Sequence, residues 1–267
     1  MAAPLTFHKY EGLGNDFVIV EGGDGEIQPE RARELCDRHF GIGADGVLLV
    51  GRPSSDGARA SMIVINADGS RPEMCGNGLR CVILHLAQLD GSSRAEYVVD
   101  TDAGPRRAQI ERSGESAMVT IDMGRGELRG ESKLDYAGRE LAFQRISMGN
   151  PHAIVLDAGL SEAQMDEIGP RLSGSIPGGS NVETVMPRAG GGFDVIVWER
   201  GVGRTLACGT GAAAVAVALA LAGRAAFERT LELHLPGGPL ELTVAERTLA
   251  VSLRGPARRV FSGQVRS

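Results

Sequence analysis

The stretch Ala207-Cys-Gly-Thr-Gly-Ala-Ala213 repeats the pattern of an earlier stretch, Met74-Cys-Gly-Asn-Gly-Leu-Arg80. Each contains Cys-Gly-x-Gly, and the two cysteines lie 133 positions apart in a chain of 267 residues. An apolar run that favours helix follows each motif and stops at Gly91 or Gly223. A spacing of half the chain length predicts two copies of one structural unit, with a thiol at the same place in each.

Other landmarks follow the same offset. Gly14-Asn15 in the first half corresponds to Gly149-Asn150, which lies 135 positions later. A predicted strand ends nine residues before each cysteine, at Asn66 and at Glu199. We therefore predict two similar domains, residues 1–130 with Cys75 and residues 131–267 with Cys208, the C-terminal strand being able to cross over to the first.

The local patterns predict a mixed α/β fold. Short β-branched runs bounded by Gly, Asn or Asp indicate strands at 17–20, 47–50, 62–65, 153–156 and 194–198. Alternation of apolar and polar residues predicts antiparallel hairpins over 107–122 and 229–253, the second turning at Pro236-Gly237-Gly238. Helices are predicted over 29–40, 79–89, 212–222 and 161–168, the last with Ser161 as its N-cap.

The two motif cysteines stand just before predicted helix N-termini. Free N–H groups and the positive end of the helix dipole stabilise anions there, so we expect the pKa of each thiol to be lowered. The glycines allow a carboxylate to approach the same N–H groups. If two such helix ends met at a domain interface, they would hold one carboxylate between two thiols. Cys36 and Cys81 lack this motif and are predicted to be small buried side chains.

Composition excludes several classes of protein. A net charge of −6 argues against a nucleic-acid binder. The chain has neither a signal-peptide pattern nor an apolar run long enough to span a membrane, and four cysteines do not form a disulfide scaffold, so we expect a cytoplasmic protein. The only lysines are Lys9 and Lys133, which disfavours a pyridoxal-phosphate enzyme because it needs a Schiff-base lysine.

Two further patterns do not indicate a cofactor or metal site. Gly41-Ile-Gly-Ala-Asp-Gly46 fits G-x-G-x-x-G but precedes a predicted strand, so it lacks the context of a dinucleotide site. The Cys and His residues lack metal-ligand spacing, and no metal site is predicted. His85 falls within an apolar helix and is predicted to be a core histidine with its hydrogen bonds satisfied.

On its motifs the chain resembles the diaminopimelate epimerase family, from about residue 7 to beyond the second cysteine helix. The resemblance rests on Gly12-Leu-Gly-Asn-Asp-Phe17, Asn66-Ala-Asp-Gly-Ser70 before Met74–Cys81, Gly149-Asn-Pro-His152, Ser180-Asn-Val-Glu183, and Glu199-Arg-Gly-Val-Gly203 before Ala207–Gly211. It implies a cofactor-independent isomerase that interconverts LL- and meso-diaminopimelate on the route to lysine and peptidoglycan. It also implies two pseudo-symmetric domains, each a mostly antiparallel or mixed sheet around a central helix, with the active site in the cleft between them, and a homodimer.

The resemblance also implies the roles of individual residues. Cys75 and Cys208 would be the acid and base on the two faces of the α-carbon. The substrate-binding residues would be Asn15, Asn66, Gly76, Asn77, Asn150, Asn181, Glu199, Arg200, Gly209 and Thr210, with Arg200 suited to the distal carboxylate and Glu199 to an ammonium. The role of His152 stays open, because it could serve only to support the turn at Asn150-Pro151.

Three positions depart from the family pattern. Arg204 stands where the family usually has Glu, Thr184 replaces a common aromatic residue, and Gly46 replaces a Gln found in some members. Two alternatives therefore stay open. One is a related racemase of another amino acid, of the histidine or proline type, although Asn77 favours diaminopimelate over proline. The other is a non-catalytic thiol-switch or ligand-binding protein in which Cys75 and Cys208 form a disulfide.

Overall fold

The chain forms two compact units. The computed structural model describes residues 4–23, 25–157 and 159–266. Unit 1 comprises residues 1–121 and 255–267, and unit 2 comprises residues 122–254. This division differs from the predicted boundary at 130/131, because it follows strand pairing. Strand β7 (Ser116–Arg125) runs past the division, and the end of β16 (Ala250–Val265) pairs with β1 (Leu5–Gly12) from Val265 to Arg258.

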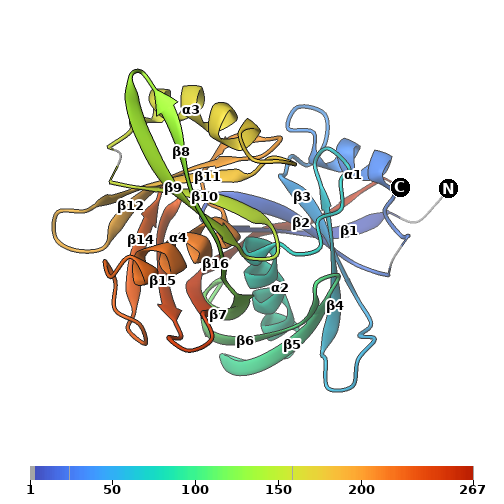
Figure 1. Ribbon diagram of the computed structural model, residues 1–267. Coiled ribbons are helices and arrows are strands. Elements are labelled where there is room, and N and C mark those ends of the chain that lie inside the picture. Colours follow the sequence, from blue (N-terminus) through green and yellow to red (C-terminus); the bar gives the residue numbers. More distant parts are fainter. Residues whose placement is uncertain (1–3, 24, 158, 267) are drawn as a thin grey trace. The chain divides into compact units, whose positions relative to one another are not determined.

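Unit 1 is a sheet around a central helix (Figure 1). Its strands are neighbours in chain order from β1 to β7; β16 lies next to β7 and also pairs with β1, so the order closes on itself. Helix α2 packs against β1 to β6 and is buried from Gly76 to Ala87. The remaining elements of the unit are β2 (Asn15–Glu21), α1 (Pro29–Cys36), β3 (Gly46–Gly51), β4 (Ala60–Asn66), α2 (Gly76–Leu89), β5 (Arg94–Thr101) and β6 (Gly104–Ser113).

Unit 2 repeats the plan around α4. Its strands are neighbours in the order β15-β14-β12-β11-β10-β9-β8, with β13 beside β12, and the first part of β16 pairs with β15. Helix α4 packs against β9, β10, β11 and β15. The elements are β8 (Glu127–Tyr136), β9 (Arg139–Ser147), β10 (Pro151–Leu156), α3 (Glu162–Gly174), β11 (Asn181–Pro187), β12 (Phe193–Glu199), β13 (Gly203–Thr205), α4 (Gly209–Leu221), β14 (Leu231–Leu235) and β15 (Gly238–Val244).

The two units share one succession of elements. In unit 1, β2, α1, β3, β4 and α2 follow each other, with β2/β3 parallel and β3/β4 antiparallel. In unit 2, β10, α3, β11, β12 and α4 do the same, with β10/β11 parallel and β11/β12 antiparallel. The predicted mixed α/β fold of two similar halves, each a sheet around a central helix, is confirmed.

Helix ends show where local sequence decides the structure. Ser161 is the N-cap of α3, as predicted, and it forms a full capping box in which its Oγ accepts from the Gln164 backbone N–H. The predicted helix 29–40 is too long, because α1 ends at Cys36. The Asp37 carboxylate accepts the backbone N–H groups of His39 and Phe40, which stabilises a turn in place of another helical turn.

The cysteine helices begin earlier than predicted and end as expected. They include the Gly-x-Gly segment, since α2 starts at Gly76 and α4 at Gly209. Gly91 and Gly223 follow them with φ of 67° and 68°, the left-handed conformation that ends a helix. Both predicted hairpins are present, as β6/β7 and as β14/β15 turning at Pro236-Gly237.

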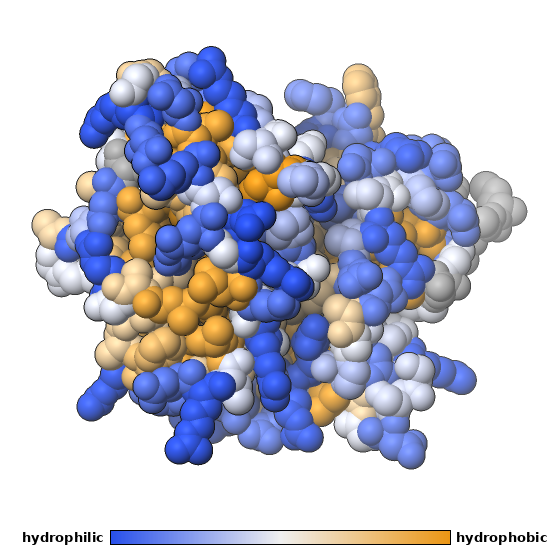
Figure 2. All heavy atoms as spheres, viewed as in Figure 1, coloured by the Kyte–Doolittle hydropathy of each residue, from blue (hydrophilic) through white to orange (hydrophobic). Residues whose placement is uncertain are grey.

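The surface is mostly hydrophilic on the face shown in Figure 2, with apolar residues gathered on unit 2 over the region of α4 and β15. The α4 segment itself is alanine-rich and buried from Gly211 to Ala220. Within residues 4–23, 25–157 and 159–266, no helix has the length and apolar character needed to cross a membrane.

Candidate active site

Each motif cysteine caps the central helix of its unit. Cys75 precedes α2 and Cys208 precedes α4, both in extended backbone conformation. The Cys75 Sγ accepts the Gly78 backbone N–H at 3.4 Å, and the Cys208 Sγ accepts the Gly211 backbone N–H at 3.4 Å. The predicted placement of both thiols at helix N-termini is thus confirmed. The same local geometry therefore occurs twice in the chain.

The second glycine of each motif packs closely against a neighbouring side chain. A Cβ at Gly78 would lie 3.0 Å from the Leu48 Cδ2 atom. A Cβ at Gly211 would lie 2.4 Å from the Glu183 Oε1 atom, a distance that no side chain tolerates. The helix start in unit 2 is therefore packed directly against a buried carboxylate.

In unit 1, the structure brings Asn15 and Asn77 together. The Asn77 Nδ2 donates to the Asn15 Oδ1 at 3.1 Å, and the Asn15 Nδ2 donates to the Asp45 Oδ2 at 2.7 Å. Asn66 lies at the same end of the sheet, since it pairs with Gly46 in the β3/β4 ladder and Gly46 pairs with Phe17 in the β2/β3 ladder. Its Nδ2 donates to the Ser70 Oγ at 2.9 Å.

A cluster of ion pairs, which the motifs did not reveal, lies next to Asn15 at this end of the sheet. Asp16 contacts Arg38 at 2.7 Å and Lys9 at 2.5 Å, and Arg38 also contacts Asp45 at 2.7 Å. Burial would raise the pKa of Asp16, but the hydrogen bonds from Arg38 and Lys9 outweigh it and hold that pKa below its usual value. These residues fix Asp45, which in turn orients the Asn15 amide.

Arg80 is a second feature that the sequence did not reveal. It lies on α2, is fully buried, and its Nε donates to the Pro256 carbonyl at 3.0 Å. Burial lowers the pKa of Arg80, while the neighbouring thiols Cys81 and Cys75 act in the opposite sense. A buried cation therefore lies within electrostatic reach of the Cys75 thiol.

In unit 2, a chain of hydrogen bonds runs from Cys208 to a buried carboxylate. The Cys208 Sγ is 3.4 Å from the Thr210 Oγ1, which accepts the Asn150 Nδ2 at 3.3 Å. The Asn150 Oδ1 lies 3.1 Å from the His152 Nε2, and the His152 Nδ1 lies 2.9 Å from the Glu183 Oε1. His152 and Glu183 are both completely buried.

The donors of this chain point toward the sulfur. Because the Asn150 Oδ1 can only accept, the His152 Nε2 donates to it. The Thr210 oxygen already accepts from Asn150, so its own proton is available to Cys208. His152, whose role was left open, and Glu183, which was noted only within a motif, are thus joined to the thiol. Glu183 could have been identified from the strand pattern, because it lies two residues after Asn181 in β11 and therefore shares its face of the strand.

The expectation of a lowered thiol pKa is wrong for Cys208. Burial raises the pKa of Cys208 well above its usual value, and the Glu199 and Glu183 carboxylates raise it further. The hydrogen bonds from Thr210 and Gly211 favour the thiolate but do not compensate. The helix N-terminus favours the thiolate of Cys208, but the half-buried Glu199 carboxylate and the buried Glu183 carboxylate oppose it. Cys208 is therefore a thiol at neutral pH.

Glu199 and Asn181 lie in the same region. The Glu199 Oε1 accepts the Thr205 Oγ1 proton at 2.6 Å, and the Asn181 Oδ1 accepts the Arg200 backbone N–H at 2.9 Å. Burial raises the pKa of Glu199, and the Glu183 charge adds to the rise. The Arg200 guanidinium is exposed and donates to the Gly178 carbonyl at 2.6 Å.

The three departures from the family pattern have structural explanations. Arg204 forms ion pairs with Glu162 at 2.5 Å and Asp166 at 2.6 Å, both on α3. Thr184 is buried in β11, where its position alternates with those of Asn181 and Glu183. A Cβ at Gly46 would lie 2.9 Å from the Ile65 carbonyl oxygen, so a larger residue would require the strands to shift.

The buried thiols outside the motif are as predicted. Cys36 and Cys81 are both buried. Burial raises the pKa of Cys36 to about 11 and also raises the pKa of Cys81. Both are therefore poor nucleophiles and act as small apolar side chains.

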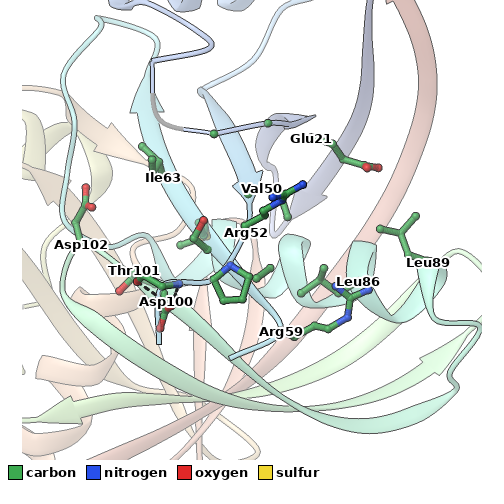
Figure 3. Close-up of a pocket in the computed structure, with 18 residues that line it drawn as sticks. Glu21, Val50, Arg52, Arg59, Ile63, Leu86, Leu89, Asp100, Thr101 and Asp102 are labelled. Carbon is green, nitrogen blue, oxygen red and sulfur yellow. Dashed lines mark hydrogen bonds between the residues drawn. The ribbon is translucent and has the colours of Figure 1, made fainter. Parts of the chain in front are cut away.

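A pocket of about 860 Å³ in unit 1 lies apart from these residues. Its lining comes from β2 to β5 and the C-terminal part of α2, and includes Glu21, Arg52, Arg59 and Asp100 (Figure 3). None of the predicted site residues contributes to it.

Comparison with known proteins agrees with the motifs. The sequence model of the family described as diaminopimelate epimerase matches residues 7–128 and 145–260. The diaminopimelate epimerase of Synechocystis sp. is 40% identical, over 97% of this chain and 98% of its own. The chloroplastic diaminopimelate epimerase of Oryza sativa subsp. japonica is 39% identical, over 97% of this chain and 79% of its own.

Solved structures share the fold at low identity. A probable proline racemase from Agrobacterium radiobacter has a TM-score of 0.79 at 17% identity, covering 98% of this chain and 92% of its own. A phenazine biosynthesis protein of the PhzF family from Bacillus anthracis has a TM-score of 0.74 at 17% identity, covering 99% of each chain. The family match covers both helix-capping cysteines and the motifs quoted from the sequence, so the chain belongs to the diaminopimelate epimerase family.

Proposed function

We propose that this protein is a cofactor-independent isomerase that epimerises LL-diaminopimelate to meso-diaminopimelate in lysine biosynthesis. One observation carries the proposal: the same Cys-capped helix occurs in each unit, with sulfur and backbone N–H 3.4 Å apart in both. The identity of the substrate is inferred from relatives that are named diaminopimelate epimerase. They are about 40% identical over nearly the whole chain.

Inversion at an α-carbon requires a base on one face and an acid on the other. In the proposed reaction, one thiolate removes the α-proton while the thiol on the opposite face donates its proton to the same carbon. The net result is an inverted centre and an exchange of the proton between the two sulfurs. The reverse reaction uses the same groups with their roles exchanged. The proposal thus requires one substrate to contact both helix N-termini.

The surroundings of the two thiols support an assignment of the resting proton. Cys208 lies beside the Glu199 and Glu183 carboxylates, which together with burial keep it protonated. Cys75 lies within reach of the buried Arg80 guanidinium, which favours a negative charge nearby. We therefore assign the resting thiolate to Cys75 and the resting thiol to Cys208. Cys75 then acts as the base that removes the α-proton, and Cys208 acts as the acid.

The helix N-termini supply the site for the reacting carboxylate. Backbone N–H groups at the start of α2 and α4 point away from the helix, and the dipole of each helix favours an anion. The residues there are Gly76, Asn77, Gly209 and Thr210. These groups would also stabilise the negative charge that develops on the carboxylate as the α-proton leaves.

The unequal residues of the two units would select the substrate. The amides of Asn15, Asn66, Asn150 and Asn181 supply hydrogen bonds to its polar groups. An ammonium beside Glu199 would neutralise that carboxylate and so remove one of the causes that raise the pKa of Cys208. Arg200 would exchange the Gly178 carbonyl for the distal carboxylate, with which it can form two parallel hydrogen bonds.

The family resemblance also supports a cytoplasmic homodimer. Light scattering of the purified protein tests the dimer directly, and a mass equal to one chain would contradict it.

The function is tested with purified protein, reducing agent and LL-diaminopimelate, and without added cofactor. We expect meso product from the wild type, and none above background from Cys75→Ala or Cys208→Ala. Cys36→Ala is the matched control, since Cys36 is a buried thiol outside both Cys-Gly-x-Gly motifs, and it should remain active. L-proline and L-histidine are assayed in parallel, and turnover of either in place of diaminopimelate would favour the related-racemase alternative.

A further inference from the structure

Three side chains of unit 1 converge at a place that the proposed reaction does not use. His8 lies on β1, Glu21 at the end of β2 and His85 on α2. One ligand atom from each lies within 4.8 Å of the others. The His85 Nε2 is 3.3 Å from the Glu21 Oε1, and the His8 Nε2 is 3.9 Å from the same oxygen.

The proton on His85 is assigned by its neighbours. The Gln88 Nε2 donates to the Glu115 carboxylate at 3.0 Å, so the Gln88 Oε1 faces Tyr10 and accepts its hydroxyl proton at 2.6 Å. The Tyr10 oxygen then has only lone pairs to offer to the His85 Nδ1, which lies 3.1 Å away and must donate.

The other nitrogen of His85 therefore presents a lone pair. A neutral imidazole that carries its single proton on Nδ1 has a lone pair on Nε2. The His85 Nε2 is buried and has no hydrogen-bond partner among the described residues. The predicted core histidine is thus only half satisfied. A buried acceptor without a partner needs an explanation, and an ion is one of them.

The distances fit a metal better than a hydrogen bond. Zinc binds imidazole nitrogens and carboxylate oxygens at about 2.0–2.2 Å, which places two ligands of a tetrahedral site about 3.3 Å apart. The His85 Nε2 and Glu21 Oε1 have this separation. The His8 Nε2 lies 3.9 Å from the same oxygen, so it has to move closer on metal binding, and its side chain is 21% exposed.

The surroundings are those of a metal site. A ligating histidine usually donates its second N–H to an oxygen that fixes the ring. The His85 Nδ1 has the Tyr10 hydroxyl, and the His8 Nδ1 lies 2.6 Å from the Ser262 Oγ. The Glu21 side chain is 55% exposed, so it is open to solvent, and it also lines the 860 Å³ pocket (Figure 3). Arg259 is the nearby opposing charge, and it lies 3.6 Å from the Glu115 carboxylate.

We propose that His8, Glu21 and His85 form a binding site for a divalent transition-metal ion of the zinc type, with a fourth position open to water. The two imidazoles and one carboxylate supply three ligands and one negative charge. The ion would join α2 to the β1/β2 hairpin at the end of the helix opposite Cys75. Its expected role is to stabilise unit 1, and the proposal does not depend on the proposed function.

The test uses the full chain with Cys75 and Cys208 replaced by Ala, so that thiolates cannot bind the ion. The metal-free protein is titrated with Co²⁺, whose visible d–d absorption reports coordination, and then with Zn²⁺ in competition. We expect one tight site per chain and a rise in thermal stability on binding. His85→Ala and Glu21→Gln should each weaken the affinity at least tenfold.

Controls keep the result interpretable. His39→Ala removes an exposed histidine outside the cluster and should leave affinity unchanged. Glu21→Gln changes an exposed side chain, so it folds even if loss of the buried His85 ring does not permit folding; circular dichroism of each variant checks this. The proposal is overturned if the parent shows no saturable Co²⁺ spectrum, or if binding persists at full strength in Glu21→Gln.

Discussion

At the scale of single residues, the chemistry of Cys208 depends on groups that are distant in sequence. Its sulfur accepts two hydrogen bonds that favour a thiolate, yet burial and the carboxylates of Glu199 and Glu183 favour the thiol. The local motif predicts only the hydrogen bonds that favour the thiolate. The raised pKa of Cys208 could not be predicted from Cys-Gly-Thr-Gly, because both carboxylates come from other strands.

Replacing Glu183 by Gln tests this balance. The change keeps the size of the side chain and removes one buried charge that raises the pKa of Cys208, so that pKa should fall. The measurement is the pH dependence of alkylation by iodoacetamide in a Cys75→Ala background. Glu232→Gln, at an exposed position in unit 2, should leave the profile unchanged. An unshifted profile in Glu183→Gln would show that the carboxylate does not act on the thiol.

Gly211 provides a second test at this scale. A methyl group there would meet the Glu183 carboxylate at 2.4 Å, so Gly211→Ala should destabilise the protein by about 1–3 kcal/mol despite the better helix propensity of Ala, and should abolish most activity. Gly174→Ala is the matched control, because it also lies in a helix but has no atom within 4 Å of the added methyl. Urea unfolding compares the two. Equal stabilities would contradict the packing described for α4.

At the scale of elements, side chains decide where helices and loops end. The capping box at Ser161 was predictable because all its members lie within four residues. The early end of α1 was not, since Asp37 could equally have continued the helix, and its capture of two N–H groups depends on the turn that follows.

Asp100 shows the same principle over a longer separation. It lies near the end of β5. Its carboxylate accepts the backbone N–H groups of Ser54 and Ser55 in the loop between β3 and β4 (Figure 3). Hydrogen bonds from Ser55 and Ser54 lower the pKa of Asp100 from 3.8 to about 2.

This lowered pKa predicts an acid-dependent stability. The folded carboxylate binds a proton less readily than the unfolded one, so its contribution is complete above pH 4 and is lost as the pH falls to about 2. Asp100→Asn should therefore be less stable than wild type at pH 7 and should lose less stability between pH 4 and 2. Thermal melts across this range provide the measurement. Parallel curves for the two proteins would contradict the prediction.

At the scale of the whole molecule, the duplication was the most predictable property. The offset between Asn15 and Asn150 and between Cys75 and Cys208 was visible in sequence, and the succession of strands and helices repeats in each unit. The division between units was less accessible. The chain passes from unit 1 to unit 2 within β7, and β16 returns, with no change of composition at either point.

The proposed site shows a similar division between what could and could not be predicted. Motif residues such as Asn77 and Asn15 were identified from sequence, and they contact each other. Arg80 and the buried His152–Glu183 pair were not given roles, because burial of a charge inside a sheet leaves no local signal. Together with Glu199, these charges make the surroundings of the two thiols unequal, with a cation near Cys75 and carboxylates near Cys208.

Deuterium incorporation distinguishes two thiols that act on opposite faces of one carbon from a single base that serves both. The enzyme is incubated with LL-diaminopimelate in D₂O, and substrate and product are analysed by mass spectrometry before equilibrium. When the intermediate goes back to substrate, the base returns the proton that it removed; when it goes on to product, the acid delivers a deuteron from solvent. We therefore expect deuterium in the meso product and almost none in the remaining LL substrate. Equal early labelling of substrate and product would indicate a single base and would rule out the proposed pair of thiols.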